Sequence, residues 1–262
     1  MTMPDQWHRT TTTTLKGLGL LATAGVLLTG CVSISLGGDD DSASPSQVAA
    51  GGGTGQPEDQ GATPAGALDA DQLAEVALPA DGTFPGGIAA GRDDQSAADA
   101  PLTMSLKLTG FTPEGECKAL FDEINDVHVP GASAVASSYE IDPAASFTAD
   151  ETPTLQVLTA TTPEPLDVMG VYGQLSEACG TIESDHGPDL TAEFAPVGDL
   201  DATTVTISAG DLGQVVAVGG KSVGHHHVYL FATMLSTEDA AEVFEAQVDR
   251  FDEVLAAAGE GE

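Results

Sequence analysis

Residues 101–121 read PLTMSLKLTGFTPEGECKALF and contain the patterns of two different elements. From Leu102 to Leu108 every second residue is apolar, which is the pattern of a strand with one buried face. Pro113 and Glu114 then open a segment whose apolar residues recur at helical spacing, so a helix is expected there. A half-buried strand that leads into an amphipathic helix predicts a sheet with a helix packed against it.

Both patterns recur toward the C-terminus. The first helix is expected to end at Pro130-Gly131, and the clearest helix follows Ser236, where a capping signal starts an apolar stripe that reaches Ala258. Because helices and strands do not alternate strictly, the sequence predicts an α+β fold with a mainly antiparallel, meander-rich sheet and two to four helices on one face. Period-2 segments predict further strands at 135–141, 155–161, 190–195, 203–208, 214–218 and 226–234, and helical spacing predicts helices near 68–76 and over 166–178.

The N-terminus carries the features of a bacterial lipoprotein signal peptide. Arg9 and Lys16 form a positive region, and residues 17–30 are apolar but too few to cross a bilayer core of about 30 Å as a helix. The tetrapeptide Leu28-Thr29-Gly30-Cys31 is the type of site at which such a peptide is cleaved and the cysteine acylated. We therefore predict a signal peptide over 1–30 and a palmitate-type lipid anchor on Cys31, on the extracytoplasmic face of the cell membrane. An uncleaved signal anchor with an unmodified cysteine is the alternative.

Composition divides the remaining chain into a linker, one domain and a tail. Residues 31–67 hold the lipidated cysteine and then Gly, Ser, Asp, Pro, Gln and Ala with almost no bulky apolar residue, so a disordered linker is expected. A linker of that length has a reach of roughly 30 to 35 Å and would hold a domain clear of the membrane. Apolar periodicity spans 68–258, which suits one domain, and 259–262 are expected to be a disordered tail.

The chain is strongly acidic. It holds 41 Asp and Glu against 7 Lys and Arg, for a formal net charge of −34. A nucleic-acid-binding protein gains affinity from Lys and Arg that displace counterions, so that class of partner is excluded. The same argument removes an anionic membrane surface as a partner, apart from the lipid anchor itself. Since the acids are spread along the chain, we interpret them as a solvated surface rather than as a cation site.

Two cysteines remain once Cys31 is assigned to the lipid. Cys117 and Cys179 each lie on a predicted helix face that points inward. In an oxidising compartment such a pair predicts a disulfide. Two free thiols with redox chemistry are the alternative, although no Cys-x-x-Cys spacing is present to activate them.

His225-His226-His227 is the one local cluster that could carry chemistry. On a strand, His225 and His227 project to the same face and can supply two zinc ligands, with His128, His186 or a carboxylate completing the site. A pH-responsive cluster is a second interpretation, because an acidic surround raises the pKa of imidazole groups. We interpret the three as surface histidines and expect no metal, with His225 and His227 as weak candidate ligands.

No enzymatic motif is complete. Residues 215–222, VVAVGGKS, look like a phosphate-binding loop, but that motif needs Gly at the position of Val215. The sequence contains no Gly-x-Ser-x-Gly nucleophile motif, and the cysteines are assigned elsewhere. We therefore expect no enzyme activity, no catalytic residue and no cofactor.

Four segments of 68–258 occur in a recognisable order: Leu78-Pro79, a helix start from Pro113 to Cys117, a strand and helix from Leu155 to Cys179, and the long C-terminal helix. In these segments the chain resembles the extracellular sensor domain of PknH-type actinobacterial kinases, a module also found on tethered lipoproteins of those bacteria. The resemblance implies an α+β sensor fold with a groove, without catalytic residues and without a kinase domain.

These observations predict a membrane-anchored lipoprotein of the cell envelope whose sensor-like domain binds a small molecule or an envelope component without catalysis. A carrier of an apolar ligand such as a lipid is the alternative, and a metal-binding surface protein is the third hypothesis. A carrier needs an internal apolar cavity of several hundred Å³, so the packing of the interior discriminates between the first two.

Overall fold

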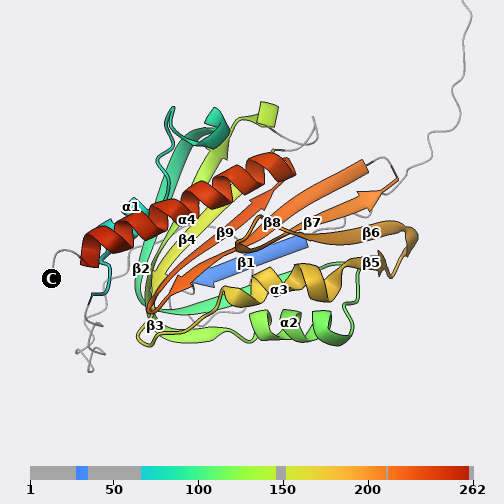
Figure 1. Ribbon diagram of the computed structural model, residues 1–262, viewed down its shortest axis with the longest axis horizontal. Coiled ribbons are helices and arrows are strands. Elements are labelled where there is room, and N and C mark those ends of the chain that lie inside the picture. Colours follow the sequence, from blue (N-terminus) through green and yellow to red (C-terminus); the bar gives the residue numbers. More distant parts are fainter. Residues whose placement is uncertain (1–27, 35–65, 146–151, 211, 260–262) are drawn as a thin grey trace, which may run out of the picture.

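A single antiparallel sheet organises the protein (Figure 1). The computed structural model describes residues 28–34, 66–145, 152–210 and 212–259. Within these ranges nine strands pair in the order β1-β2-β3-β4-β9-β8-β7-β6-β5, and the predicted α+β class with a mainly antiparallel sheet is confirmed. The strands are β1 (Leu28–Ile34), β2 (Ala89–Leu108), β3 (His128–Ile141), β4 (Thr154–Thr161), β5 (Thr181–Ser184), β6 (Gly187–Pro196), β7 (Asp201–Ala209), β8 (Leu212–Val223) and β9 (His226–Thr233).

The strand order resolves into two meanders. Strands β1 to β4 lie in sequence order on one side, and β9 back to β5 lie in sequence order on the other. The two halves meet where β4 pairs with β9, from Thr154 opposite Thr233 to Thr161 opposite His226. Within the described sheet, this central pair is the only place where two strands that do not follow one another in strand order lie side by side.

Helices cover both faces of the sheet, so the expectation of helices on one face is wrong. Helices α2 (Gly115–Asn125) and α3 (Gly170–Cys179) pack on one face, and α1 (Ala70–Val76) and α4 (Thr237–Gly259) pack on the other (Figure 1). Residues 227–232 of the central strand β9 are all buried. A strand buried on both faces has no period-2 apolar pattern, and it needs a covering layer on each face of the sheet. No helix among the described residues is long and apolar enough to cross a membrane.

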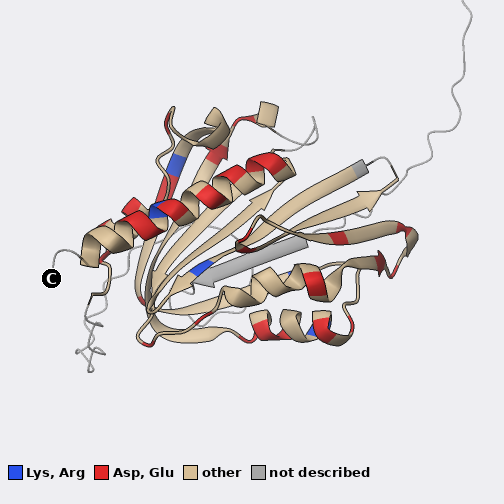
Figure 2. Ribbon diagram, in the orientation of Figure 1, with Lys and Arg blue, Asp and Glu red and all other residues tan. Residues whose placement is uncertain are grey.

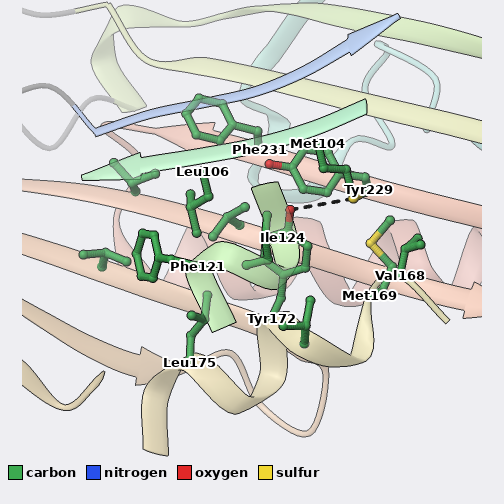
Figure 3. Packing of buried hydrophobic residues seen from close by; sticks show 14 of the residues in the cluster. Met104, Leu106, Phe121, Ile124, Val168, Met169, Tyr172, Leu175, Tyr229 and Phe231 are labelled. Carbon is green, nitrogen blue, oxygen red and sulfur yellow. Dashed lines mark hydrogen bonds between the residues drawn. The ribbon is translucent and has the colours of Figure 1, made fainter. Parts of the chain in front are cut away.

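The face under α2 and α3 is filled by interlocking side chains (Figure 3). Tyr172 of α3 is completely buried there, and its hydroxyl contacts the sulfur of Met104 on β2 at 3.9 Å. Phe121 of α2 meets Phe194 of β6 edge to face, with ring centroids 6.3 Å apart. This packing gives the hypothesis of an apolar-ligand carrier no support on this face.

The disulfide predicted between Cys117 and Cys179 is present. It joins α2 to the end of α3, with the two Cα atoms 4.7 Å apart. Cys117 is buried in the same cluster as Phe121 and Leu175, so the bond ties both helices to the core that they cover.

The sequence pattern did not predict the strand segments at the edges of the sheet, which are the first half of β2 and the whole of β5. Strand β2 begins at Ala89, although alternation predicted a strand only from Leu102. Residues 90–96 are mostly exposed, because this half of β2 pairs only with β3 and has no second neighbour in the described sheet. A strand that is exposed on both faces carries no apolar alternation, and the four residues of β5 are too few to show one.

The helix predicted to start at Pro113 and Glu114 is shorter than expected. Helix α2 ends at Asn125, and Pro130-Gly131 lie inside β3 rather than at a helix end. Pairing between β3 and β4 begins only at Ser133, so the missing N–H of Pro130 falls where no β4 residue needs it. The register between β2 and β3 also shifts between Ala100 and Leu102, which absorbs the irregularity.

The phosphate-loop-like stretch 215–222 is part of β8. A Cβ on Gly220 would stand 1.9 Å from the carbonyl oxygen of Val228 on β9, and one on Gly219 would stand 2.3 Å from that of Asp201 on β7. Gly219 also has a φ of +145°, which favours glycine. Gly219 and Gly220 therefore allow the backbones of β7, β8 and β9 to approach closely. This close approach explains why glycine occupies both positions, so a phosphate-binding role is not needed to explain them.

Removing the disulfide tests how much the α2–α3 layer depends on it. Cys117→Ala with Cys179→Ala should lower the free energy of unfolding by about 2 to 5 kcal/mol, because the bond restricts the unfolded chain, while the far-ultraviolet circular dichroism stays native. Urea unfolding of the variant and of chemically reduced protein measures the loss, and the two should agree. A loss below about 0.5 kcal/mol in both samples would contradict this role.

Candidate functional site

The candidate binding site is a surface groove beside the C-terminal end of α1. Its volume is about 560 Å³, a size that suits a small molecule. It lies between α1, the segment after α1, the first half of β2 and the last half of α4. The lining residues are Ala74, Glu75, Ala77, Pro79, Arg92 and Arg250.

Helix α1 is held in place from its first turn. Asp69 accepts the backbone N–H of Gln72, and the side chain of Gln72 accepts that of Asp69, which forms a complete capping box. Leu73 and Val76 are buried against the α4 face of the sheet. The short helix thus presents its other side, with Ala74 and Glu75, to the groove.

Two arginines bind the free carbonyl groups at the end of α1. Arg92 of β2 donates from Nη1 to the carbonyl oxygens of Ala77 at 2.7 Å and Leu78 at 3.1 Å. Arg250 of α4 donates from Nε to the carbonyl oxygen of Glu75 at 3.0 Å. The last carbonyls of a helix lack partners within it and carry partial negative charge, so cationic donors are favoured at this end.

Gln247 and Tyr139 complete the same set of contacts. Gln247 of α4 is fully buried; its amide donates to the carbonyl oxygen of Val76 at 2.6 Å and accepts the N–H of Leu78 at 3.1 Å. The hydroxyl of Tyr139 on β3 donates to the carbonyl oxygen of Leu78 at 2.7 Å. Burial raises the pKa of Tyr139 to about 12, so this hydroxyl stays protonated as a donor.

The groove combines apolar walls with guanidinium groups that are only partly neutralised. Arg92 pairs with Asp94 at 2.7 Å, and Arg250 pairs more loosely with Glu253 at 3.4 Å. A guanidinium carries five N–H donors, and within the described part of the chain the Nη2 group of Arg250 has no hydrogen-bond partner. The groove can therefore offer a charged donor and a small apolar surface to the same ligand.

Figure 2 shows how rare positive charge is on this protein. Red Asp and Glu positions run along α4, and blue positions are few. The groove could not be predicted from the sequence, because its residues come from four separate segments. A signal was nevertheless present: Arg92 and Arg250 are the two arginines that follow Cys31, and both meet at one cavity.

The three histidines do not form the arrangement that a metal would need. Strand β9 starts at His226, so His225 lies in the preceding turn, where its Nδ1 donates to the carbonyl oxygen of Thr162 at 3.0 Å. His226 and His227 fall on opposite faces, and the Nε2 of His226 donates to the carbonyl oxygen of Gly66 at 3.1 Å. Among the residues that the structure describes, which include His128 and His186, no group of three ligands could hold a metal ion.

His227 is buried, so its interpretation as a surface histidine is wrong. Its Nδ1 lies 3.0 Å from the hydroxyl of Ser222, and its Nε2 lies 2.9 Å from that of Thr162. Thr162 donates to the carbonyl oxygen of Glu164, and Ser222 accepts the N–H of Val168, so every group is satisfied when His227 is neutral and protonated on Nε2. The ring thus fastens the segment before α3 to the β8–β9 hairpin.

This network favours a structural role over nucleophilic catalysis. Burial lowers the pKa of His227 to about 4, which makes the imidazole a weak base for Ser222. The second ring nitrogen faces the hydroxyl of Thr162 rather than a carboxylate that would stabilise an imidazolium. Nothing in this arrangement assigns a reaction to the pair.

Cys31 lies in β1, opposite Ser105 of β2. The sequence analysis predicted the signal peptide to end at residue 30 and a linker to follow, and it expected no strand at 28–34. The rest of the predicted signal peptide, residues 35–65 of the linker, and residues 260–262 of the tail lie outside the described residues. Acylation of Cys31 stays a prediction.

Comparison with known proteins leaves the family open. No family model matches the sequence, and neither does any curated protein. A solved structure of an uncharacterized protein from Mycobacterium smegmatis, the Rv0999 ortholog, shares 18% sequence identity, covers 62% of this chain and 90% of that chain, and has a TM-score of 0.33. A likeness at this level assigns neither a family nor a function, so the resemblance to the PknH-type sensor domain stays a prediction.

The buried histidine predicts a pH dependence of stability. Because its folded pKa of about 4 lies below the ordinary value of 6.5, the unfolded chain binds the extra proton first, and stability should fall as pH falls from 6.5 toward 4. The His227 contribution to this loss is at most about 3 kcal/mol. Urea unfolding between pH 7.5 and 4 should give a flatter profile for His227→Gln than for wild type, with exposed His128→Gln as the control. Equal profiles for wild type and His227→Gln would contradict the prediction.

Proposed function

We propose that this protein is a membrane-anchored lipoprotein of the cell envelope whose domain binds a small acidic molecule in the groove beside α1, without catalysis. The observation that carries the proposal is the convergence of Arg92 and Arg250 on one cavity of about 560 Å³ in a chain with a net charge of −34. In a chain with few cations, two guanidinium groups that line one cavity favour a ligand with a negative group.

The shape of the groove suggests the class of ligand. Ala74, Ala77 and Pro79 provide apolar contacts, and the Nη2 group of Arg250, which has no hydrogen-bond partner among the described residues, provides a donor. A compact molecule that bears one carboxylate or phosphate on an apolar body fits both. Another hollow, of about 290 Å³ between α2 and α3, is lined by Glu116 and Glu177 without a cation and does not share this chemistry.

The location in the envelope rests on two independent features. The Leu28–Cys31 sequence matches a lipoprotein cleavage site, and the Cys117–Cys179 disulfide suits an oxidising compartment. The resemblance to the PknH-type sensor domain supports a sensor-like role, in which ligand binding in the groove is passed to another envelope component. Nucleic acid stays excluded as a partner by charge.

Ligand binding is tested with octanoate as the probe and octan-1-ol as its neutral counterpart. Isothermal titration should show octanoate binding to wild type, weakened about tenfold or more by Arg250→Gln, because a charge-assisted hydrogen bond contributes about 1.5 to 3 kcal/mol. Lys221→Gln is the matched control: Lys221 also forms an ion pair with α4, through Asp252, but lies outside the groove lining. Octanol should bind more weakly than octanoate.

The outcomes separate the hypotheses. Equal binding of octanol and octanoate, unaffected by Arg250→Gln, would favour the carrier of apolar ligands. Absence of octanoate binding to wild type would count against the groove as the acidic-ligand site. Arg92 is not replaced, because it also holds Ala77 and Leu78.

Anchoring is tested at Cys31. Cys31→Ala should leave an unprocessed precursor that is not acylated, since the thiol is both the acylation site and the marker for cleavage. Intact mass and membrane fractionation of variant and wild type measure this. A Cys31→Ala protein that reaches the mature mass and still partitions with membranes would overturn the lipoprotein assignment.

A further inference from the structure

The segment that holds Cys31 is paired with the sheet rather than separate from it. Strand β1 runs antiparallel to the second half of β2, with Leu28 opposite Leu108 and Ile34 opposite Leu102. Cleavage before Cys31 would remove the first part of β1 and leave Cys31–Ile34 opposite Leu102–Ser105. Acylation and pairing would then act on the same short segment.

The other edge of this half of β2 already has partners. The N–H of Met104 is 3.4 Å from the carbonyl oxygen of Val127, and the side chain of Asn125 both accepts the N–H of Leu106 at 2.9 Å and donates to its carbonyl oxygen at 3.1 Å. The side-chain amide of Asn125 therefore hydrogen bonds to β2 in the place that a backbone group of β3 would otherwise take. The outer edge of β2 from Leu102 to Leu108 pairs with β1 in the described sheet, and without β1 it would be an open strand edge.

This edge is also free of acidic side chains. Residues 101–112, PLTMSLKLTGFT, contain no Asp or Glu, and neither do residues 28–34. The one charged residue in the two stretches is Lys107, which is exposed on β2. In a chain with 41 acidic residues, an edge that is neutral apart from one lysine is not repelled by an anionic bilayer as the acidic surface is.

We propose that Cys31–Ile34 stays paired with β2 in the acylated protein, so that the lipid anchor holds this edge of the sheet, with Lys107, against the membrane surface. The proposal rests on the acylation of Cys31 proposed above. Residues 35–65 then connect β1 to α1 within one domain and do not set its distance from the bilayer. Because the two strands belong to one chain, pairing has an effective concentration of about millimolar, which favours β1 over a strand from another molecule.

The pairing is tested by cross-linking in the membrane-bound protein. Ser33 stands directly opposite Thr103, so Ser33→Cys with Thr103→Cys should form a disulfide under mild oxidation, detected by mass after proteolysis. Ser33→Cys with Lys107→Cys is the matched control, because Lys107 lies opposite Thr29 and out of register with Ser33. The in-register pair should cross-link about tenfold faster, in line with the steep dependence of disulfide formation on Cα separation.

The orientation is tested by fluorescence quenching. The one tryptophan of the chain, Trp7, lies in the predicted signal peptide. A tryptophan introduced into the processed protein would therefore be the only source of tryptophan fluorescence. Thr109→Trp, just after β2, should be quenched by brominated phospholipid in vesicles, whereas Asp189→Trp on β6 should not, and melting temperatures near wild type confirm that both variants fold.

The results distinguish the two proposals. An intact mass without acyl chains refutes lipidation, while cross-linking still reports the pairing in the precursor. An acylated protein in which both cysteine pairs cross-link at the same rate, or in which Thr109→Trp and Asp189→Trp are quenched alike, overturns the docked edge and restores a flexible tether.

Discussion

The pairing of β4 with β9, from Thr154 opposite Thr233 to Thr161 opposite His226, holds the two halves of the sheet together. It joins two meanders that would otherwise be separate sheets, and it does so across 65 residues between Thr161 and His226. Residues 157–161 of β4 and 227–232 of β9 are all buried, so each face of this central pair needs its own helical cover. The disulfide between α2 and α3 secures one cover, and the packing of α1 against α4 supplies the other.

The groove is a consequence of that second cover. Helix α1 is too short to be stable alone, and its final carbonyl groups need donors from outside the helix. The protein supplies them from β2, β3 and α4, and two of the four donor side chains are arginines. The same contacts that stabilise α1 therefore place positive charge in a cavity, which is why a structural requirement and the proposed binding site coincide there.

The sequence predicted best where one face of an element is buried. Leu102 to Leu108 and the stripe of α4 were found because burial on one side imposes a period on the sequence. The exposed half of β2 shows no such period, and Pro130 lies within a strand because its missing donor falls opposite no residue of β4. His227 was taken for a surface residue because nothing local reveals that the segment near Thr162 covers it.

The fold class, the acidic surface, the cysteine pair and the candidate acylation site could be predicted from the sequence, since each depends on composition, period or a short-range motif. Three features became visible only in the folded chain: helices cover both faces of the sheet, Gly219 and Gly220 permit close strands, and Arg92 and Arg250 share a cavity. Those features depend on contacts between residues far apart in the chain, such as Gln247 with Val76. Local sequence patterns carry no record of such contacts, because the register that creates them is set by the whole sheet.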